Sequence, residues 1–133
     1  MANALYPKYK EALLQSGVNL STGNVKAVLV DLADYTYSAA HTFLSDIPSL
    51  GRVATSGNLG SKTFTNGVFD SADPSFTAVT GDVSEAIVLF VDTGTASTSP
   101  LIAFYDTGVT GLPVTPNGGD INIVVNASGW FAL

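Results

Sequence analysis

The chain contains one histidine, His41, so any acid–base or Ser-His-Asp mechanism that uses a histidine must use this residue. Its local sequence, from Ala39 to Phe43, contains neither a nucleophile elbow nor a spacing typical of metal ligands. Capping or hydrogen bonding inside the fold is the commoner use of a histidine in such a setting. We therefore expect a structural role for His41, and the sequence predicts that the protein is not an enzyme.

Aspartates occur in two close pairs, Asp31 with Asp34 and Asp70 with Asp73. Paired carboxylates can cleave a glycosidic bond or hold calcium. Nearly all acids of this chain, however, fall at predicted strand ends or in turns, where Asp is favoured because its side chain accepts hydrogen bonds from nearby backbone amides. No pair has the EF-hand spacing. Turn capping is the expected role, with a calcium site and catalysis as alternatives, and we predict no metal, no cofactor and no catalytic residue.

Aromatic residues offer a further kind of site, because sugars stack on flat rings and acidic groups bind their hydroxyls. The candidates for such a carbohydrate-binding face are Tyr35, Tyr37, Phe43, Trp130 and Phe131. Packing in a core or a protein interface is the commoner use of aromatic rings. The sequence leaves both uses open, because it does not show which rings are exposed.

Charged residues are rare, at 12% of the 133 residues against roughly 25% in typical soluble domains. The surface must therefore be built from Ser, Thr, Asn and Gly, whose burial costs far less than the burial of ions. Such a surface suits a protein that packs against other proteins. The formal net charge is −6, with few and scattered cations, so we expect no direct contact with nucleic acid.

The sequence lacks cysteine-dependent sites, a membrane-spanning segment and the pattern of an export signal. There is no cysteine, which excludes disulfides, thiolate metal sites and cysteine nucleophiles. The longest purely apolar run, Ala86 to Val91, is far shorter than the roughly 20 residues of a membrane helix. Charged residues in the middle of the segment from Met1 to Ser16 argue against an export signal. We expect a soluble protein with no membrane partner.

The first part of the chain predicts a short amphipathic helix. Between Asn3 and Gln15, apolar residues recur at spacings of three and four, and Gly17 would end the helix. Pro7 suits the first turn, where its missing amide hydrogen costs nothing, so the helix should begin near Tyr6. We expect residues 1–17 to form this helix or arm and residues 24–133 to form the β core of a single domain.

The rest of the chain predicts a mainly β fold. Short runs rich in Val, Ile, Thr and Phe alternate with Gly, Asn, Asp and Pro at intervals of about ten residues, which is typical of an antiparallel β-sandwich or barrel. One segment, Ser38 to Ile47, instead predicts a helical turn or short helix. Ile87 to Val91 and Ile121 to Val125 are apolar on nearly both faces, so we expect both to be central strands. The predicted strands are Asn24 to Asp31, Arg52 to Thr55, Lys62 to Thr65 with Val68 and Phe69, Phe76 to Val79, Ser84 to Asp92, Leu101 to Asp106, Ile121 to Asn126, and Trp130 to Ala132.

A series of short segments runs through both halves of the chain. In the first half they are Ala4-Leu5-Tyr6, Val25 to Asp31, Ala33 to Thr36, and Phe43 to Pro48. In the second half they are Phe76 to Gly81, Ser84 to Ala86, Asp92 to Gly94, and Leu112 to Ile121. Taken together, over nearly the whole chain, they resemble small accessory virion proteins of tailed bacteriophages.

The resemblance implies a structural function and brings no catalytic motif with it. Its implied role is that of a capsid decoration (cement) protein, which stabilises the head by binding at capsomer junctions. A neck or tail protein, and a glycan- or host-surface-binding module, are the alternatives. The implied partners are the major capsid protein or other virion proteins, and a homo-oligomer, a trimer or dimer, would match a local symmetry axis. The implied location is the virion, with the capsid surface favoured, after synthesis in the host cytoplasm.

The candidate interface combines apolar and aromatic residues from both ends of the chain. Its members are Leu5, Tyr6, Tyr9, Leu13, Trp130 and Phe131. The apolar stripe of the N-terminal helix can either dock on a neighbouring protein or cover one end of its own sheet, and the sequence leaves these alternatives open. The carboxyl end lacks the lysine that the resembling proteins often carry near their last residues.

Overall fold

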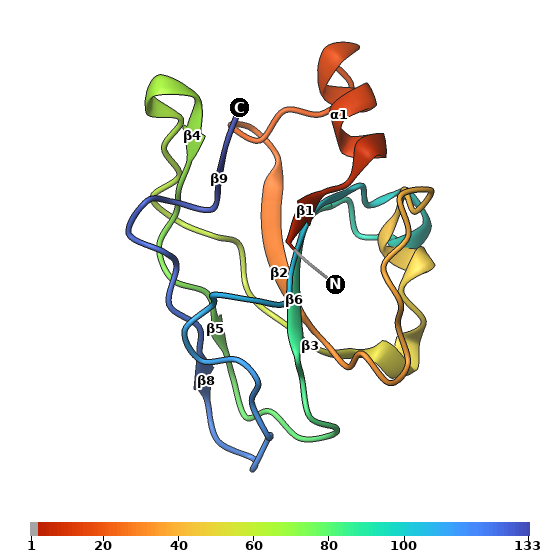
Figure 1. The fold of residues 1–133 in the computed structure, drawn as a ribbon, viewed down its shortest axis with the longest axis vertical. Helices are drawn as coiled ribbons and strands as arrows, with labels where there is room; N and C mark the ends of the chain where they lie inside the picture. The colour runs from red at the N-terminus through yellow and green to blue at the C-terminus, as the bar shows by residue number, and fades with distance from the viewer. Residues whose placement is uncertain (1–2) are drawn as a thin grey trace.

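A five-stranded antiparallel sheet is the main element of the computed structural model, which describes residues 3–133. The strands lie in the order β1-β7-β6-β2-β3, so that β1 and β3 are its edges (Figure 1). Their bounds are Ala4–Leu5 for β1, Asn24–Val30 for β2, Arg52–Thr55 for β3, Ala86–Asp92 for β6 and Leu101–Tyr105 for β7. The predicted mainly β, antiparallel fold is thereby confirmed.

The centre of this sheet is the pair of longest strands, β2 and β6. They are aligned over their full length, from Asn24 opposite Asp92 to Val30 opposite Ala86. Residues 86–90 of β6 are all buried, as expected for a strand that is covered on both faces. The prediction that Ile87 to Val91 form a central strand is therefore confirmed.

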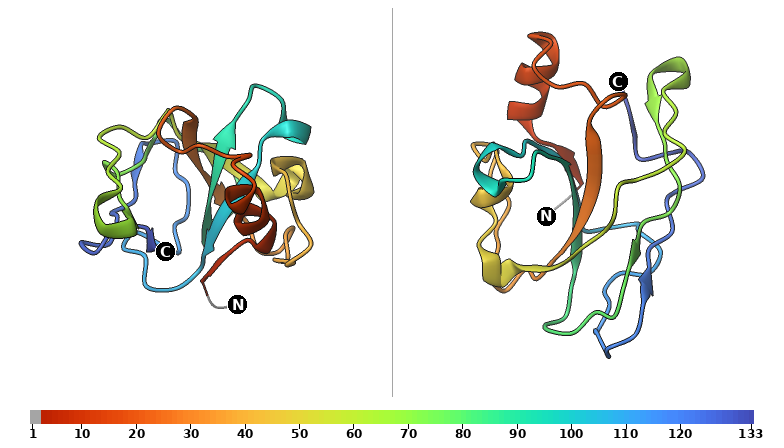
Figure 2. Two further views of the ribbon diagram at one scale, coloured as in Figure 1. Left: turned by 90° about the horizontal axis from the view of Figure 1, so that it is seen from above. Right: turned by 180° about the vertical axis from the view of Figure 1, so that it is seen from behind.

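A second β layer covers one face of the sheet and consists of two short ribbons. Strand β4 (Val68–Phe69) pairs with β9 (Phe131–Ala132), and β5 (Ser75–Phe76) pairs with β8 (Ile121–Asn122). In Figures 1 and 2 both ribbons stand beside the large sheet as a separate layer. Of the two architectures that the sequence left open, the structure has the sandwich.

The segment between β2 and β3 packs on the other face of the large sheet (Figure 2). It contains two short 3-10 helices, η1 (Leu44–Asp46) and η2 (Ser49–Gly51). Helical structure in the predicted segment from Ser38 to Ile47 is thus limited to the single turn of η1. Two further 3-10 turns, η3 (Thr65–Gly67) and η4 (Ala96–Thr98), lie in connections between strands.

The prediction of a second central strand, from Ile121 to Val125, is wrong. Only Ile121–Asn122 form a strand, and β5 is its partner. The next backbone amides bond to loops instead of a ladder, for example that of Ile123 to the Pro74 carbonyl. Burial alternates, with Ile123 fully buried and Val124 46% exposed. One face of this segment therefore looks outward and carries Asn122 and Val124.

Helix α1 (Pro7–Leu14) has Tyr6 at its N-cap and Pro7 in its first turn, as predicted. Its Tyr9 is buried and the helix packs against β7, so its apolar stripe covers one end of the chain's own sheet. Gly17 follows the helix, and its amide donates to the Ala12 carbonyl at 2.7 Å. Within residues 3–133, no helix has the length and hydropathy that crossing a bilayer would require.

Candidate functional site

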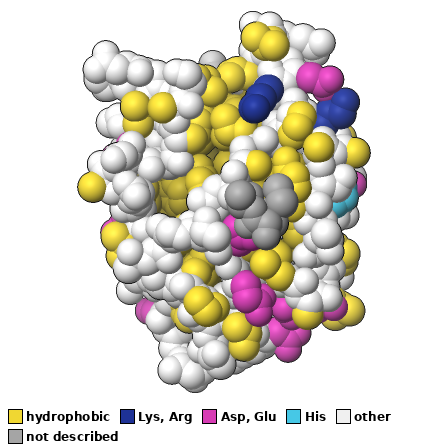
Figure 3. All heavy atoms as spheres, in the orientation of Figure 1, with side chains coloured by type: hydrophobic (Ala, Val, Ile, Leu, Met, Phe, Trp, Pro, Cys, Tyr) yellow, Lys and Arg dark blue, Asp and Glu magenta, His cyan; other side chains and the backbone are white. Residues whose placement is uncertain are grey.

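An apolar groove of about 380 Å³ opens between α1 and the β4–β9 ribbon. In Figure 3 it is the hollow between the two upper projections of the molecule, and hydrophobic side chains cover its inside. None of the described residues that line it has a charged side chain. The lining consists of Tyr9, Leu13, Ser16, Val18, Asn19, Leu20, Ser21, Phe64, Gly67, Val68, Phe69, Phe131 and Leu133. We refer to this site as the groove.

The interior of the groove is a row of aromatic rings from distant parts of the sequence. Tyr9 of α1 meets Phe131 of β9 edge to face, with ring centroids 6.1 Å apart. Phe131 also packs on Phe69, and Phe69 stacks on Phe64 at 5.6 Å. Leu13, one helical turn after Tyr9, extends this row along α1 because residues i and i+4 share a helix face. The row gives the groove a continuous apolar surface.

Polar anchors hold the walls of the groove in place. Trp130, next to β9, donates from Nε1 to Ser71 Oγ at 2.8 Å and from its backbone amide to the Phe69 carbonyl at 2.7 Å. Its own carbonyl accepts from the Tyr105 hydroxyl at 2.7 Å. Opposite, Lys62 Nζ donates to the Leu20 carbonyl at 2.7 Å and so ties the loop after α1 to the second layer. The groove is therefore preformed.

The predicted interface residues separate into three groups. Tyr9, Leu13 and Phe131 line the groove, although Tyr9 is only 2% exposed and presents little of its ring there. Tyr6 and Trp130 are buried, at 0% and 7% exposure, so their side chains pack inside the chain itself. Leu5 is half-buried in the edge strand β1. Sequence reasoning missed the other lining residues, among them Phe64, Phe69 and Leu133, because only the fold brings them to the same groove as α1.

The aromatic candidates for sugar binding do not form one exposed face. Tyr35 and Trp130 are 3% and 7% exposed, so neither presents a free ring surface. Tyr37 packs between Tyr6 and Phe104, with centroid distances of 5.0 and 5.4 Å. The rings are used mainly for packing, which is the commoner of the two roles considered for them.

His41 is hydrogen-bonded to the fold, as predicted. Its Nδ1 lies 2.8 Å from the Tyr35 hydroxyl, which in turn lies 2.8 Å from the Tyr6 hydroxyl. Burial raises the pKa of Tyr35 to about 12. Burial also raises the pKa of Tyr6 well above its usual range, helped by the hydrogen bond to Tyr35. Both phenols are therefore neutral at physiological pH and act as hydrogen-bonding groups.

Several aspartates accept hydrogen bonds from nearby backbone amides, as expected, whereas Asp73 accepts one from a distant segment. Asp31 accepts the Ala33 amide, Asp70 accepts the Ser71 amide, and Asp73 accepts the Val125 amide, at 2.8–2.9 Å. Asp46 accepts the amides of Phe43 and Thr42, and these two bonds hold its carboxyl pKa below its usual range. The predicted pair Asp70 and Asp73 thus caps two different segments and does not form a joint site.

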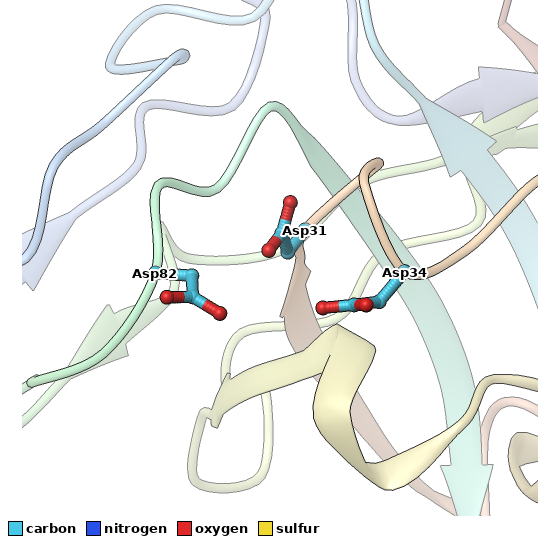
Figure 4. A group of neighbouring side chains, drawn as sticks. All are labelled: Asp31, Asp34 and Asp82. Atoms are coloured by element: carbon cyan, nitrogen blue, oxygen red, sulfur yellow. The ribbon is translucent and has the colours of Figure 1, made fainter.

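The other pair, Asp31 and Asp34, is joined by Asp82 from the loop before β6 (Figure 4). Carboxylate oxygens of the three residues lie within 4.8 Å of one another. Asp31 is buried, whereas the other two are exposed, and neither of the described salt bridges reaches them. Three such oxygens are the donor type that calcium takes, but without a cation the same arrangement brings negative charges together.

We predict that Asp82→Asn slightly stabilises the protein at low salt in the presence of EDTA. The substitution removes one of three mutually repelling charges and none of the side-chain hydrogen bonds within residues 3–133, so the expected gain in the free energy of unfolding is about 0.5 kcal/mol or less. Thermal unfolding at neutral pH measures it. The gain should shrink at high salt, where exposed charges are screened. A variant that is less stable than the wild type in EDTA would contradict the repulsion.

Comparison with known proteins gives no assignment for this chain. No model of a known protein family matches it, and no curated protein sequence matches it.

Proposed function

We propose that this chain is a structural virion protein of a tailed bacteriophage, and that it stabilises the capsid by binding at capsomer junctions. The observation that carries the proposal is the groove, a preformed and uncharged apolar surface to which three of the predicted interface residues contribute. The resemblance of the sequence segments to small phage virion proteins supplies the biological setting.

The groove fits an apolar side chain of a neighbouring virion subunit. Aromatic and aliphatic anchors that fill such pockets supply most of the binding energy in protein interfaces. Two exposed leucines add apolar surface, because Leu133 on the groove lining is 70% exposed and Leu14 at the end of α1 is 87% exposed. An apolar surface rimmed by uncharged polar residues is a feature of interaction sites.

The distribution of charge supports the same role. On the face shown in Figure 3, most acidic side chains lie in the lower half, away from the groove. A partner can therefore approach the groove without having to desolvate an acidic side chain of its lining. The net charge of −6 would at the same time steer the protein toward a basic outer surface of a capsid.

The host-surface alternative has weaker support than a virion-assembly role. It relies on aromatic rings that stack on sugars, and Tyr35 and Trp130 are covered by the chain itself. A neck or tail position is compatible with the same groove, because an apolar docking surface does not specify which virion protein it contacts. The location in the particle is therefore the quantity to measure.

The decisive experiment adds purified protein to particles that lack it and measures bound copies by co-sedimentation and cryo-EM. We expect Leu133→Asp to reduce binding at least tenfold, because a charge at this position must be desolvated when the groove is covered. Leu133 is 70% exposed in the free protein, so the substitution should not disturb folding.

The matched control is Leu50→Asp. Leu50 has a similar exposure of 77% but belongs to η2 and does not line the groove. The Leu50→Asp variant should bind particles as the wild type does. Equal binding by both variants would remove the groove from the proposal. Density only in the neck, tail or fibres would replace decoration by another structural role, and no density in the particle would overturn the virion assignment.

A further inference from the structure

We propose that neutral His41 holds the start of α1 in place through a chain of three hydrogen-bonded side chains, and that protonation of His41 releases it. We refer to this arrangement as the latch. The inference concerns the conformation of the protein and does not depend on the proposed virion function. It rests on the positions of Tyr6, Tyr35 and His41 and on the number of hydrogens that they can share.

The three side chains form a continuous path from the core to the surface. The Tyr6 hydroxyl is 2.8 Å from the Tyr35 hydroxyl, and the latter is 2.8 Å from His41 Nδ1. Tyr6 is 0% exposed and Tyr35 is 3% exposed, whereas His41 is only half-buried. Water therefore reaches the imidazole end of the path but not its tyrosine end.

With neutral His41, the path has one arrangement that satisfies every group. Tyr6 donates its hydroxyl hydrogen to Tyr35, and Tyr35 donates to Nδ1, which carries a lone pair when the ring hydrogen is on Nε2. Each buried donor then has an acceptor. The imidazole is thus the final acceptor for both buried hydroxyl hydrogens.

Protonation of His41 removes this acceptor, because both ring nitrogens of an imidazolium are donors. If the path reversed, Nδ1 would donate to Tyr35 and Tyr35 to Tyr6, and the Tyr6 hydrogen would have no partner among the described hydrogen bonds. An unsatisfied donor inside the core is costly. The cheaper response is for the half-buried imidazolium to leave Tyr35 and move toward solvent, because water can then take its place as the acceptor for the Tyr35 hydroxyl hydrogen.

A charged group that interacts with His41 favours the same response. Asp46 interacts electrostatically with His41 and is itself fixed by the amides of Thr42 and Phe43. Its carboxylate attracts the imidazolium, whereas the neutral phenols of Tyr35, Tyr6 and Tyr37 offer no compensating charge. Protonation therefore exchanges the contact with Tyr35 for one with Asp46 or water.

Release of the latch loosens the start of α1. Tyr6 is the N-cap of this helix, and its carbonyl accepts the amides of Tyr9 and Lys10 at 3.0 and 3.3 Å. Once water replaces the imidazole as the acceptor for Tyr35, the path that fixes the Tyr6 side chain ends at a solvent molecule instead of a side chain of the fold. Opening of the first helical turn should become more frequent, and hydrogen exchange detects such openings.

NMR on the intact chain, labelled with 15N, tests the latch directly. His41 is the only histidine, so its ring gives one pair of nitrogen signals. We expect the neutral ring to carry its hydrogen on Nε2. As acid protonates His41, which these nitrogen signals report directly, exchange at the Tyr9 and Lys10 amides should accelerate about tenfold beyond the intrinsic pH effect.

His41→Gln is the informative variant, because the Gln amide oxygen can accept from Tyr35 but is not protonated under conditions that protonate His41. In this variant, acid should no longer accelerate hydrogen exchange at the Tyr9 and Lys10 amides. Tyr37→Phe, which removes a neighbouring hydroxyl outside the path, should respond to acid like the wild type. A neutral ring with its hydrogen on Nδ1, or an equal acid response in His41→Gln and wild type, would overturn the proposal.

Discussion

Replacing Phe104 with alanine is expected to lower the free energy of unfolding by about 3–5 kcal/mol. Phe104 lies in β7, is completely buried, and packs its ring 5.4 Å from Tyr37 and 6.4 Å from Tyr35. Alanine would lose the burial of the ring and leave a cavity between the sheet and the segment that covers it. Since domains of this size are stable by roughly 5–15 kcal/mol, urea unfolding should show a much lower midpoint.

Phe64→Ala is the matched control for this prediction. Phe64 is 42% exposed at the groove, and its main ring contact is with Phe69. Removing the same atoms there leaves a space that water fills, so the expected cost is only about 1 kcal/mol. If the two variants were equally unstable, the position of Phe104 at the centre of the core would be wrong.

The sequence predicted four of the five strands of the large sheet because each has a strong local pattern, whereas β1 (Ala4–Leu5) lies in the segment that was assigned to the N-terminal helix or arm. Arg52–Thr55 has the bounds that were predicted, and Asn24–Val30 differs from the prediction by one residue. The central position of β6 followed from its apolar residues on both faces. In these segments, turn residues at both ends and uninterrupted apolar or alternating patterns determine the structure without reference to distant residues.

The same reasoning failed for Ile121 to Val125, because a short apolar segment satisfies two patterns at once. Its residues are compatible with a strand buried on both faces and with one that is half exposed. What decides between them is the partner: β5 offers only two residues for pairing, and the neighbouring backbone bonds to loops. That choice depends on contacts between distant segments, which local periodicity does not contain.

Only part of the groove could be predicted, because some of its residues carry a local sequence signal and others do not. Tyr9 and Leu13 were found because the helical period places them on one face, and Phe131 was found as an apolar residue near the chain end. Phe64 and Phe69 carried no comparable signal, since they fall in short strand-like segments. Their meeting with α1 requires the β4–β9 pairing, which joins residues more than 60 positions apart.

Gly129→Ala is expected to destabilise the protein by about 3 kcal/mol, because both the backbone conformation and the close packing at this position require glycine. Its φ is +90°, which costs a residue with a Cβ about 1–2 kcal/mol. In addition, a Cβ there would lie 2.7 Å from Val68 Cγ1 and 2.8 Å from the Phe69 carbonyl oxygen. Both contacts belong to β4, so the β4–β9 ribbon would have to move apart, at a further cost of about 1–3 kcal/mol.

Gly118→Ala separates the two contributions, since its φ of +87° is nearly the same but a Cβ there would meet no atom within 4 Å. It should therefore cost only the backbone part, about 1–2 kcal/mol by urea unfolding. The difference between the variants measures how tightly β4 and β9 are packed. Because Val68, Phe69 and Phe131 form one wall of the groove, Gly129→Ala should also weaken particle binding, whereas Gly118→Ala should leave it unchanged. Equal stability of the two variants would mean that this wall is not rigid, and the groove would then not be preformed.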